Sequence, residues 1–240
     1  MIRGIYQNSS AMQLLENKVD VIANNLANIS TAGYKRRDVS FQQMIEAEQA
    51  LDRNMLKVKL PDGFTPTYTD NSDGRLKQTG NPLDIALSGK GFFQVKTDNG
   101  LAYTRDGNFK INSEGQMVTP DGYKVMGNSG PIEINGSKID VDQSGQISVD
   151  GKVVNQFLFK NINIDNSIIM KDNLYKQKTT GYLEDAKPRV SQGFVEESNV
   201  NNVKEMVEMI SAQRLYEANQ KLIKAQDDTL NKAVNQIARS

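Results

Sequence analysis

The stretch ANNLANISTAGYK, from Ala23 to Lys35, lies where an apolar heptad pattern gives way to a different kind of sequence. Three asparagines occur within five positions here, and asparagine is a mediocre helix former. A helix that ends at this point would tolerate these asparagines, whereas a longer helix would need contacts that offset their cost. The sequence on either side of the stretch decides which explanation holds.

The residues before this stretch predict one helix, from about residue 3 to 29, with an apolar seam on one side. Apolar residues recur every seven positions, with a second set at the offset positions: Ile5, Met12, Val19 and Leu26, then Leu15, Ile22 and Ile29. This is the a/d pattern of helices that pack on other helices. Ser30, Thr31 and Gly33 then end the predicted helix.

A second helix is predicted from about Asn202 to near the end of the chain. Its main seam repeats every seven residues through Met209, Tyr216, Ile223, Leu230 and Ile237. Asn219 and Gln226 make the offset positions partly polar. Asn202 and Glu205 have the spacing of a capping box ahead of an apolar run.

The centre of the chain has the two-residue alternation of β-strands instead. Leu83, Ile85 and Leu87 alternate with other residues, and runs such as GFFQV and QFLFKNI follow. Five turn dipeptides separate these runs: Asn99-Gly100, Asp106-Gly107, Asp121-Gly122, Asn135-Gly136 and Asp150-Gly151. Such dipeptides favour tight hairpin turns, so we expect a body of short strands.

These patterns predict an α+β fold in which long N- and C-terminal helices form a coiled-coil-like domain beside a central all-β domain. Residues 1–40 and 195–240 would form a discontinuous helical assembly domain, 41–80 a connecting segment, and 81–194 the β-rich body. Within the connecting segment, Phe41 to about Met55 could be helical. The two apolar seams are too long for the β body alone to cover, so we expect them to pack on each other and on other chains.

The composition of the 240-residue chain excludes several classes of protein. Lysine plus arginine equals aspartate plus glutamate, 29 each, which argues against nucleic-acid binding. Histidine and cysteine are absent, which removes the usual general base and the usual zinc and thiolate chemistry. We therefore expect no enzyme, no catalytic residue, no metal site and no cofactor. No segment is apolar enough to insert in a membrane, and the first residues lack the apolar region of a cleaved Sec signal.

Two glycine-containing runs are near misses for ligand-binding motifs. IDVDQSGQISVDG begins like a calcium-binding loop with Asp140, Asp142 and Ser144, but Gly151 stands where the bidentate glutamate belongs. Its flanks alternate, so we expect a hairpin that turns at Ser144-Gly145. GKGFFQ lacks the third glycine of a dinucleotide fingerprint, so we expect a strand that buries its phenylalanines.

Two charged runs have both a plain and a functional interpretation. Glu196 and Glu197 could serve as a catalytic pair, but neighbours in a strand point to opposite faces, which argues against that role. Lys35, Arg36 and Arg37 form a basic cluster, for which we expect a solvated loop. The alternative is that this cluster contacts acidic residues of a neighbouring subunit.

Four segments together resemble the flagellar basal-body rod and hook proteins of bacteria: ANNLANISTAGYK, NPLDIALSGKGFFQV, YTRDGNFKINSEGQMVTPDGYKVMG and QGFVEESNVNNVKEMVEMISAQRLYEANQKLI. The resemblance implies a structural rod subunit located in the flagellar basal body. Such a subunit would leave the cell unfolded through the flagellar export apparatus, without a cleaved Sec signal. It would then polymerise as a homo-oligomer in a helical tube, next to other rod and hook-basal-body proteins.

Within that family, the region between Phe41 and Asn81 is short for a distal-rod protein, which favours the proximal-rod type. A distal-rod or other hook-basal-body axial subunit is the alternative. An alternative of a different class is a β-domain ligand-binding or enzymatic protein with helical oligomerisation arms.

The opening stretch then has a proposed role in assembly. Ala23 and Ala27 share a face, as do Asn24 and Asn28, and all lie off the seam. Small residues admit a second helix and amides can donate and accept across the gap, although solvated asparagines at a helix end would look the same. The predicted assembly interface consists of Val19, Ile22, Ala23, Asn24, Asn25, Leu26, Ala27, Asn28, Ile29, Met209, Tyr216, Ile223, Leu230 and Ile237.

Overall fold

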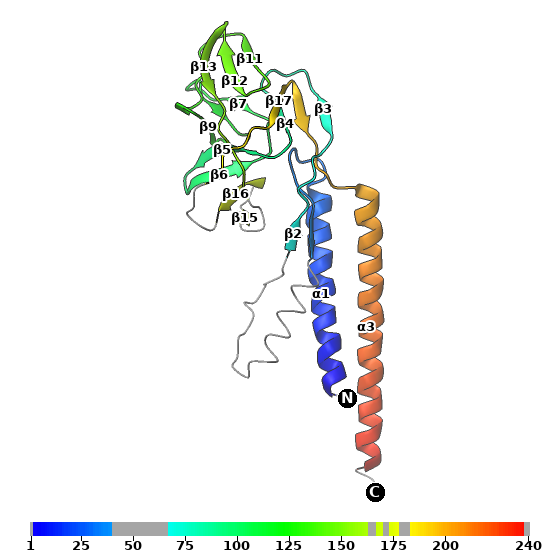
Figure 1. Cartoon of the computed structure of the whole chain (residues 1–240). Helices are drawn as coiled ribbons and strands as arrows, with labels where there is room; N and C mark the ends of the chain where they lie inside the picture. The colour runs from blue at the N-terminus through cyan, green and yellow to red at the C-terminus, as the bar shows by residue number, and fades with distance from the viewer. Residues whose placement is uncertain (1, 40–66, 163–166, 170–172, 178–182, 238–240) are drawn as a thin grey trace. The chain divides into compact units, whose positions relative to one another are not determined.

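The computed structural model describes residues 2–39, 67–162, 167–169, 173–177 and 183–237 (Figure 1). It divides into two compact units. The helical unit comprises Met1–Ala27, Arg37–Tyr68 and Asn201–Ser240, and the β unit comprises Asn28–Arg36 and Thr69–Val200. The chain therefore leaves the helical unit after Ala27 and re-enters it at Arg37.

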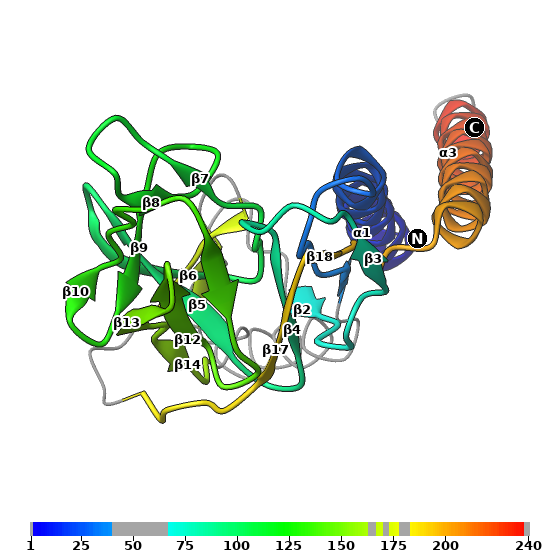
Figure 2. The ribbon, with the colours of Figure 1, turned by 90° about the horizontal axis from the view of Figure 1, so that it is seen from above.

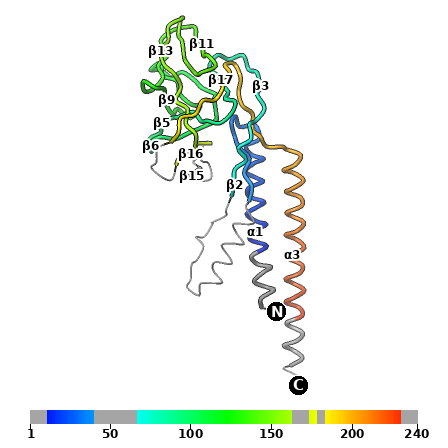
Figure 3. The backbone as a smooth tube through the Cα atoms, viewed as in Figure 1, coloured from blue at the N-terminus to red at the C-terminus, as the bar shows by residue number. Residues whose placement is uncertain are grey.

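The helical unit contains helices α1 (Ile2–Ala27) and α3 (Asn202–Ile237), with β1 (Arg37–Val39) paired to β2 (Thr67–Thr69). The two helices pack against each other and run in opposite directions (Figure 3). Both helices were expected, and their bounds lie within two residues of the expected ends. The helix expected from Phe41 to about Met55 lies outside the described residues.

The start of α3 differs from the expected capping box. Asn201, one residue earlier than expected, is the cap: its Oδ1 accepts the Lys204 amide at 3.1 Å, and its carbonyl accepts the Glu205 amide at 3.0 Å. An asparagine side chain in this position satisfies one of the amides that the first helical turn leaves unpaired. Asn202 is therefore not the cap, and the Glu205 carboxylate has a different partner.

The β unit is the mainly β body that the alternating pattern predicted. In chain order, its earlier strands are β3 (Leu76–Gln78), β4 (Ile85–Ser88), β5 (Phe92–Thr97), β6 (Gly100–Thr104), β7 (Lys110–Ile111), β8 (Met117–Val118), β9 (Lys124–Gly127) and β10 (Gly130–Pro131). The later strands are β11 (Ile139–Val141), β12 (Gln146–Val149), β13 (Lys152–Gln156), β14 (Phe159–Lys160), β15 (Ser167–Ile169), β16 (Tyr175–Gln177), β17 (Arg189–Gln192) and β18 (Phe194–Glu196).

One antiparallel sheet, with strands of unequal length, is the main structural element of this body. Its order is β15-β16-β6-β5-β9-β8-β7, with β10 on β9 and β14 on β5. Figure 2 shows β5 near the centre of the body, with β6 and β9 beside it. A separate sheet has the order β11-β12-β13, and the late strands β17 and β18 pair with the early strands β4 and β3. The last pairings close the body because they join residues near both of its ends.

Turn chemistry explains three of the five predicted hairpins. Asp150 and Gly151 both have positive φ, 49° and 80°, as a type I′ turn between β12 and β13 requires. Gly100 and Gly122 have positive φ at the β5–β6 and β8–β9 turns. The β11–β12 hairpin also turns as expected, with Gly145 at φ 84°.

The other two dipeptides do not close hairpins between paired strands, so that prediction was wrong. Gly107 instead allows close approach of two backbones, since a Cβ there would lie 1.6 Å from the Ile85 carbonyl oxygen. Gly136 makes room for the side chains of Val149 and Asp150, since a Cβ there would lie 2.4 Å and 2.3 Å from their atoms. At both positions a glycine is required for close packing rather than for a turn.

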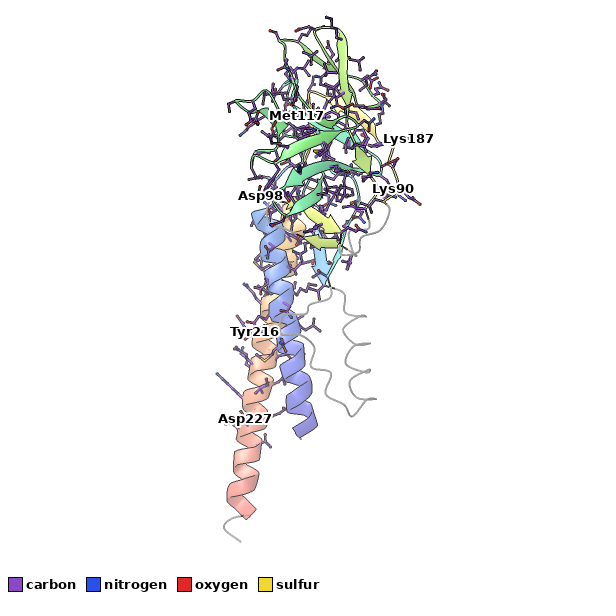
Figure 4. The ribbon with its side chains drawn as sticks, turned by 90° about the vertical axis from the view of Figure 1, so that its left-hand side faces the viewer. Lys90, Asp98, Met117, Lys187, Tyr216 and Asp227 are labelled. Atoms are coloured by element: carbon purple, nitrogen blue, oxygen red, sulfur yellow. The ribbon has the colours of Figure 1, made fainter. Side chains whose placement is uncertain are left out.

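An aromatic cluster fills the core of the β unit. Phe93, fully buried in the middle of β5, contacts Phe109, Phe157 and Phe159 with ring centroids 5.0 to 5.7 Å apart. Met117, which Figure 4 labels within the body, is also fully buried. The expectation that the GFFQ run supplies strand core is confirmed.

We expect Phe93→Ala to destabilise the protein by about 3–5 kcal/mol, because it leaves a cavity at the centre of this cluster. Val153→Ala on the exposed side of β13 is the control, with an expected change within about 0.5 kcal/mol. Urea unfolding followed by tyrosine fluorescence would measure both. Similar free energies of unfolding for the two variants would contradict the assignment of the core.

Candidate assembly interface

Asn25 is fully buried in the helical unit and pairs with the backbone of Arg37 in both directions. Its Nδ2 donates to the Arg37 carbonyl oxygen at 2.8 Å, and its Oδ1 accepts the Arg37 amide at 3.0 Å. An amide side chain has the donor and acceptor geometry of a peptide group, so it can replace a strand partner. Asn25 thereby fixes where the chain returns to the helical unit after the excursion that began at Asn28.

The same side chain fixes the register of α3 along α1. Asn25 Nδ2 also donates to Glu205 Oε2 at 3.0 Å, and Glu205 is fully buried on α3. A second link, from Lys18 to Glu208 at 3.8 Å, joins the same two helices. A buried polar pair between helices disfavours other registers, because any shift would leave both groups without partners.

Asn25, predicted as a residue of the assembly interface, forms all of these hydrogen bonds within its own subunit. Glu205, its partner, was not recognised as a site residue. The sequence signal for this role was a single glutamate, Glu205, four positions before Met209 of the seam. It was interpreted as part of a capping box, so its role as a buried partner was missed.

The other predicted interface residues whose side chains the structure describes fall into three groups by exposure. Ile22 is buried, and the half-buried residues are Val19, Leu26, Asn28, Ile29, Met209, Tyr216 and Ile223. Ala23, Asn24 and Ala27 are exposed. Leu230 and Ile237 lie on α3, but their side chains are outside the described residues. Figure 4 labels Tyr216 part-way along α3, the helix that carries the C-terminal seam.

An exposed apolar face on α3 was missed. Val203, Met206, Val207 and Ile210 are 71%, 48%, 57% and 50% exposed, and they share one side of the first turns of the helix. Leu215 and Leu222 are exposed further along. The spacing i, i+3, i+4, i+7 is present in the sequence, but only the seven-residue repeat through Met209 was interpreted as an apolar side of the helix.

The basic cluster is not the solvated loop that we expected. Lys35 is 1% exposed, and its Nζ donates to Glu196 Oε1 at 2.6 Å and to the Ser72 carbonyl at 2.7 Å. Arg36 is also buried, and its amide donates to Asn199 Oδ1 at 2.6 Å. The sequence interpretation failed because a charged side chain is buried only when distant residues supply partners, and Glu196 is far away in sequence.

Glu196 is a structural anion of the β unit. Its Oε1 also accepts the Gly74 amide at 2.9 Å, and its Oε2 accepts from Arg105 Nη1 at 3.4 Å. Arg105 donates further to the carbonyl oxygens of Leu87 and Gly89. Both carboxylate oxygens are thus occupied by fixed donors, which leaves neither available to act as a catalytic base.

Gly33 allows the chain just before Lys35 to pass close to Arg105 and Glu196. Its φ is +65°, and a Cβ at this position would lie 2.5 Å from the Arg105 backbone. Its amide donates to the Glu196 carbonyl oxygen at 2.7 Å. The glycine in STAGYK is therefore required by a left-handed backbone and by close contact, rather than only by the end of a helix.

Two carboxyl groups of the β unit have shifted pKa values. A hydrogen bond from the Ser72 amide, together with the charges of Arg36 and Lys35, lowers the pKa of Asp70, although burial opposes this. Burial raises the pKa of Asp106 to about 6, and the charges of Asp121 and Asp84 act in the same direction. The Asp70 shift thus comes mainly from a local hydrogen bond, and the Asp106 shift mainly from burial.

The β unit also carries two open hollows. An open hollow of about 450 Å³ lies between Ser144, Phe157 and Lys187, and another of about 510 Å³ lies between Gly80, Ile139 and Gln192. Within the described ranges, no three acidic side chains gather as a metal site would need. Among those residues, no helix is long and apolar enough to cross a membrane.

Three protein-family models match parts of this chain. Residues 5–35 match the flagella basal body rod protein model, 86–154 match the flagellar hook protein FlgE/F/G D1 domain, and 191–237 match the flagellar basal body rod FlgEFG protein C-terminal model. The matches appear in the order that the resemblance of the four segments implied.

Individual relatives cover almost the whole chain. Flagellar basal-body rod protein FlgG of Bacillus subtilis is 32% identical over 98% of this chain and 99% of its own length. The chain belongs to the flagellar basal-body rod proteins. FlgG of Buchnera aphidicola from Schizaphis graminum is 34% identical over 97% of this chain, and FlgF of Rhizobium meliloti is 30% identical over all of it.

This rod protein is a structural subunit of the flagellar basal body and not an enzyme. It assembles with other rod and hook-basal-body proteins. The expectations of family, structural function and location are confirmed.

We expect Asn25→Ala to lower the stability of the helical unit by more than 2 kcal/mol, because it removes partners from Arg37 and Glu205, at roughly 1–3 kcal/mol per buried group. Asn24→Ala, one position along on the exposed side, is the matched control and should change stability by less than about 1 kcal/mol. Thermal unfolding followed by helix circular dichroism of the full chain would measure both. Equal losses would show that Asn25 has no special role.

Lys35→Met should destabilise the β unit by about 3–5 kcal/mol, because Glu196 would stay buried without its main counter-charge. Lys77→Met, at an exposed position on β3, is the control. Adding Glu196→Leu to Lys35→Met should recover part of the loss, since an apolar replacement of a buried pair is often tolerated. Urea unfolding in which both lysine variants behave alike would contradict the account.

Proposed function

We propose that this rod protein polymerises with copies of itself into a helical tube through its terminal helices. The observation that carries the proposal is the exposed apolar face of α3. One side of α3 already packs on α1, yet Val203, Val207 and Ile210 stay half or more exposed on another side. A helix that is apolar on two sides requires two neighbours, and within the helical unit α1 is one of them.

The proposal assigns the helical assembly domain to residues 1–40 and 195–240, with 41–80 as a connecting segment and 81–194 as the β-rich body. The seam between α1 and α3 would be coiled-coil-like and would continue through Leu230 and Ile237. Ala23, Asn24 and Ala27 would contact neighbouring subunits, while Asn25 and Ile22 hold the pair together. This division follows the change from seven-residue to two-residue periodicity in the sequence.

Membership in the rod family supports two further parts of the proposal. The subunit would be exported unfolded by the flagellar export apparatus, without a cleaved Sec signal. It would occupy the proximal rod, which the short region between Phe41 and Asn81 favours. Antibody labelling of purified basal bodies would test the position, and label at the hook-proximal end of the rod would assign the subunit to the distal rod instead.

Val203→Glu should stop rod assembly without unfolding the subunit. The acid lies in the first turn of α3, where the helix dipole favours a negative charge, but it removes an apolar contact from every subunit interface. Gln213→Glu, on an exposed position of the same helix, is the matched control. We expect exported protein from both variants, and motility and complete rods in electron micrographs from the control alone.

Normal rods built from the Val203→Glu subunit would contradict the proposed function, because α3 would then have no need of a neighbour at its apolar face. A Val203→Glu protein that fails to reach the culture medium would instead point to export. Secretion and helix circular dichroism, measured for both variants, separate these outcomes.

A further inference from the structure

Helix α1 carries an exposed stripe that faces away from α3. Glu16, Asp20, Ala23 and Ala27 are all exposed and follow the spacing i, i+4, i+7, i+11, which places them on one side of the helix. The buried residues Ile22 and Asn25, which contact the rest of the helical unit, lie on the other side. The stripe is acidic at one end and small at the other, and spans about 16 Å.

Helix α3 carries a stripe with the same spacing. Val203, Val207, Ile210 and Arg214 are exposed at i, i+4, i+7, i+11. They lie opposite the side that carries buried Glu205 and Ala212. This stripe is large and apolar at one end and basic at the other, so its chemistry is the complement of the α1 stripe.

The two stripes match when an α1 and an α3 run in opposite directions. Ala27 then lies opposite Val203, and Ala23 lies opposite Val207, so each valine meets an alanine, while Ile210 lies opposite Asp20. The same alignment brings Arg214 level with Glu16, and Asp20 one turn away. Among the residues that the structure describes, none of these three charged side chains forms an ion pair.

The two stripes of one subunit lie on opposite sides of its helix pair, because the Asn25–Glu205 contact holds the other sides together. They are therefore out of reach of each other within one chain. We propose that the α3 stripe docks on the α1 stripe of a second copy of this chain, with Arg214 between Glu16 and Asp20. Such a contact is heterologous, so each added subunit presents a fresh stripe.

This inference rests on the proposed function and names the two surfaces that meet. Its energy comes mainly from covering the apolar side chains, since exposed ion pairs contribute only about 0.2–1 kcal/mol. The charges disfavour a shift of α3 by one turn toward the start of α1 instead, because it would place Val207 against Asp20 and Ile210 against Glu16, with Arg214 beyond both acids.

Cysteine crosslinking tests the contact without background, because the chain contains no cysteine. Cells would express two differently tagged full-length chains, one with Ala27→Cys and the other with Val203→Cys. Oxidation of isolated basal bodies should give a disulfide-linked dimer that carries both tags, since the Cα atoms would lie within about 7 Å. Ala27→Cys with Leu222→Cys, an exposed position farther along α3, is the control.

Charge reversal provides a second measurement that does not require crosslinking. Arg214→Glu should reduce the number of complete rods at least tenfold, and Glu16→Arg in the same chain should restore most of them. Complete rods with no more crosslink than the control, or no recovery in the double variant, would overturn the pairing of stripes while leaving polymerisation intact. If wild-type basal bodies held a single copy of the subunit, the proposed function itself would fail.

Discussion

The amide of Asn25 constrains the helical unit at three places at once. It pairs with both backbone groups of Arg37 and with the carboxylate of Glu205, and the side chains of Asn25 and Glu205 are both fully buried. Without these partners the amide would cost free energy rather than contribute it, so the end of α1, the return of the chain and the level of α3 are linked. The opposite sides of both helices are left for other contacts.

The β unit has a comparable constraint in the buried charges of Lys35, Glu196 and Arg105. Burial of these charges costs several kcal/mol per ion, and only the dense set of hydrogen bonds around them offsets that cost. The N-terminal segment and the last strand of the β unit are therefore held together by polar contacts that accept few substitutions. One glycine, Gly33, makes this close approach possible.

Most of the fold could be predicted from the sequence, because periodicity reports local structure. The seven-residue repeats predicted α1 and α3, and alternation around Phe93 predicted a buried strand. Partners far apart in the sequence could not be predicted this way. Lys35 looked solvated because nothing near it indicated Glu196, and the contact between Asn25 and Glu205 was missed because Glu205 was explained as a helix cap. The exposed face of α3 could have been predicted, since Val203, Val207 and Ile210 have helical spacing.

The central claim is that Asn25 is satisfied within its own subunit, which leaves the outer sides of α1 and α3 to build the rod. A density map of the native rod at side-chain resolution tests this most directly. The account predicts the Asn25 amide between Arg37 and Glu205 of the same chain, with Ala27 against Val203 of a neighbouring chain. An Asn25 side chain that pairs with another subunit, while Arg37 lies elsewhere, would contradict it.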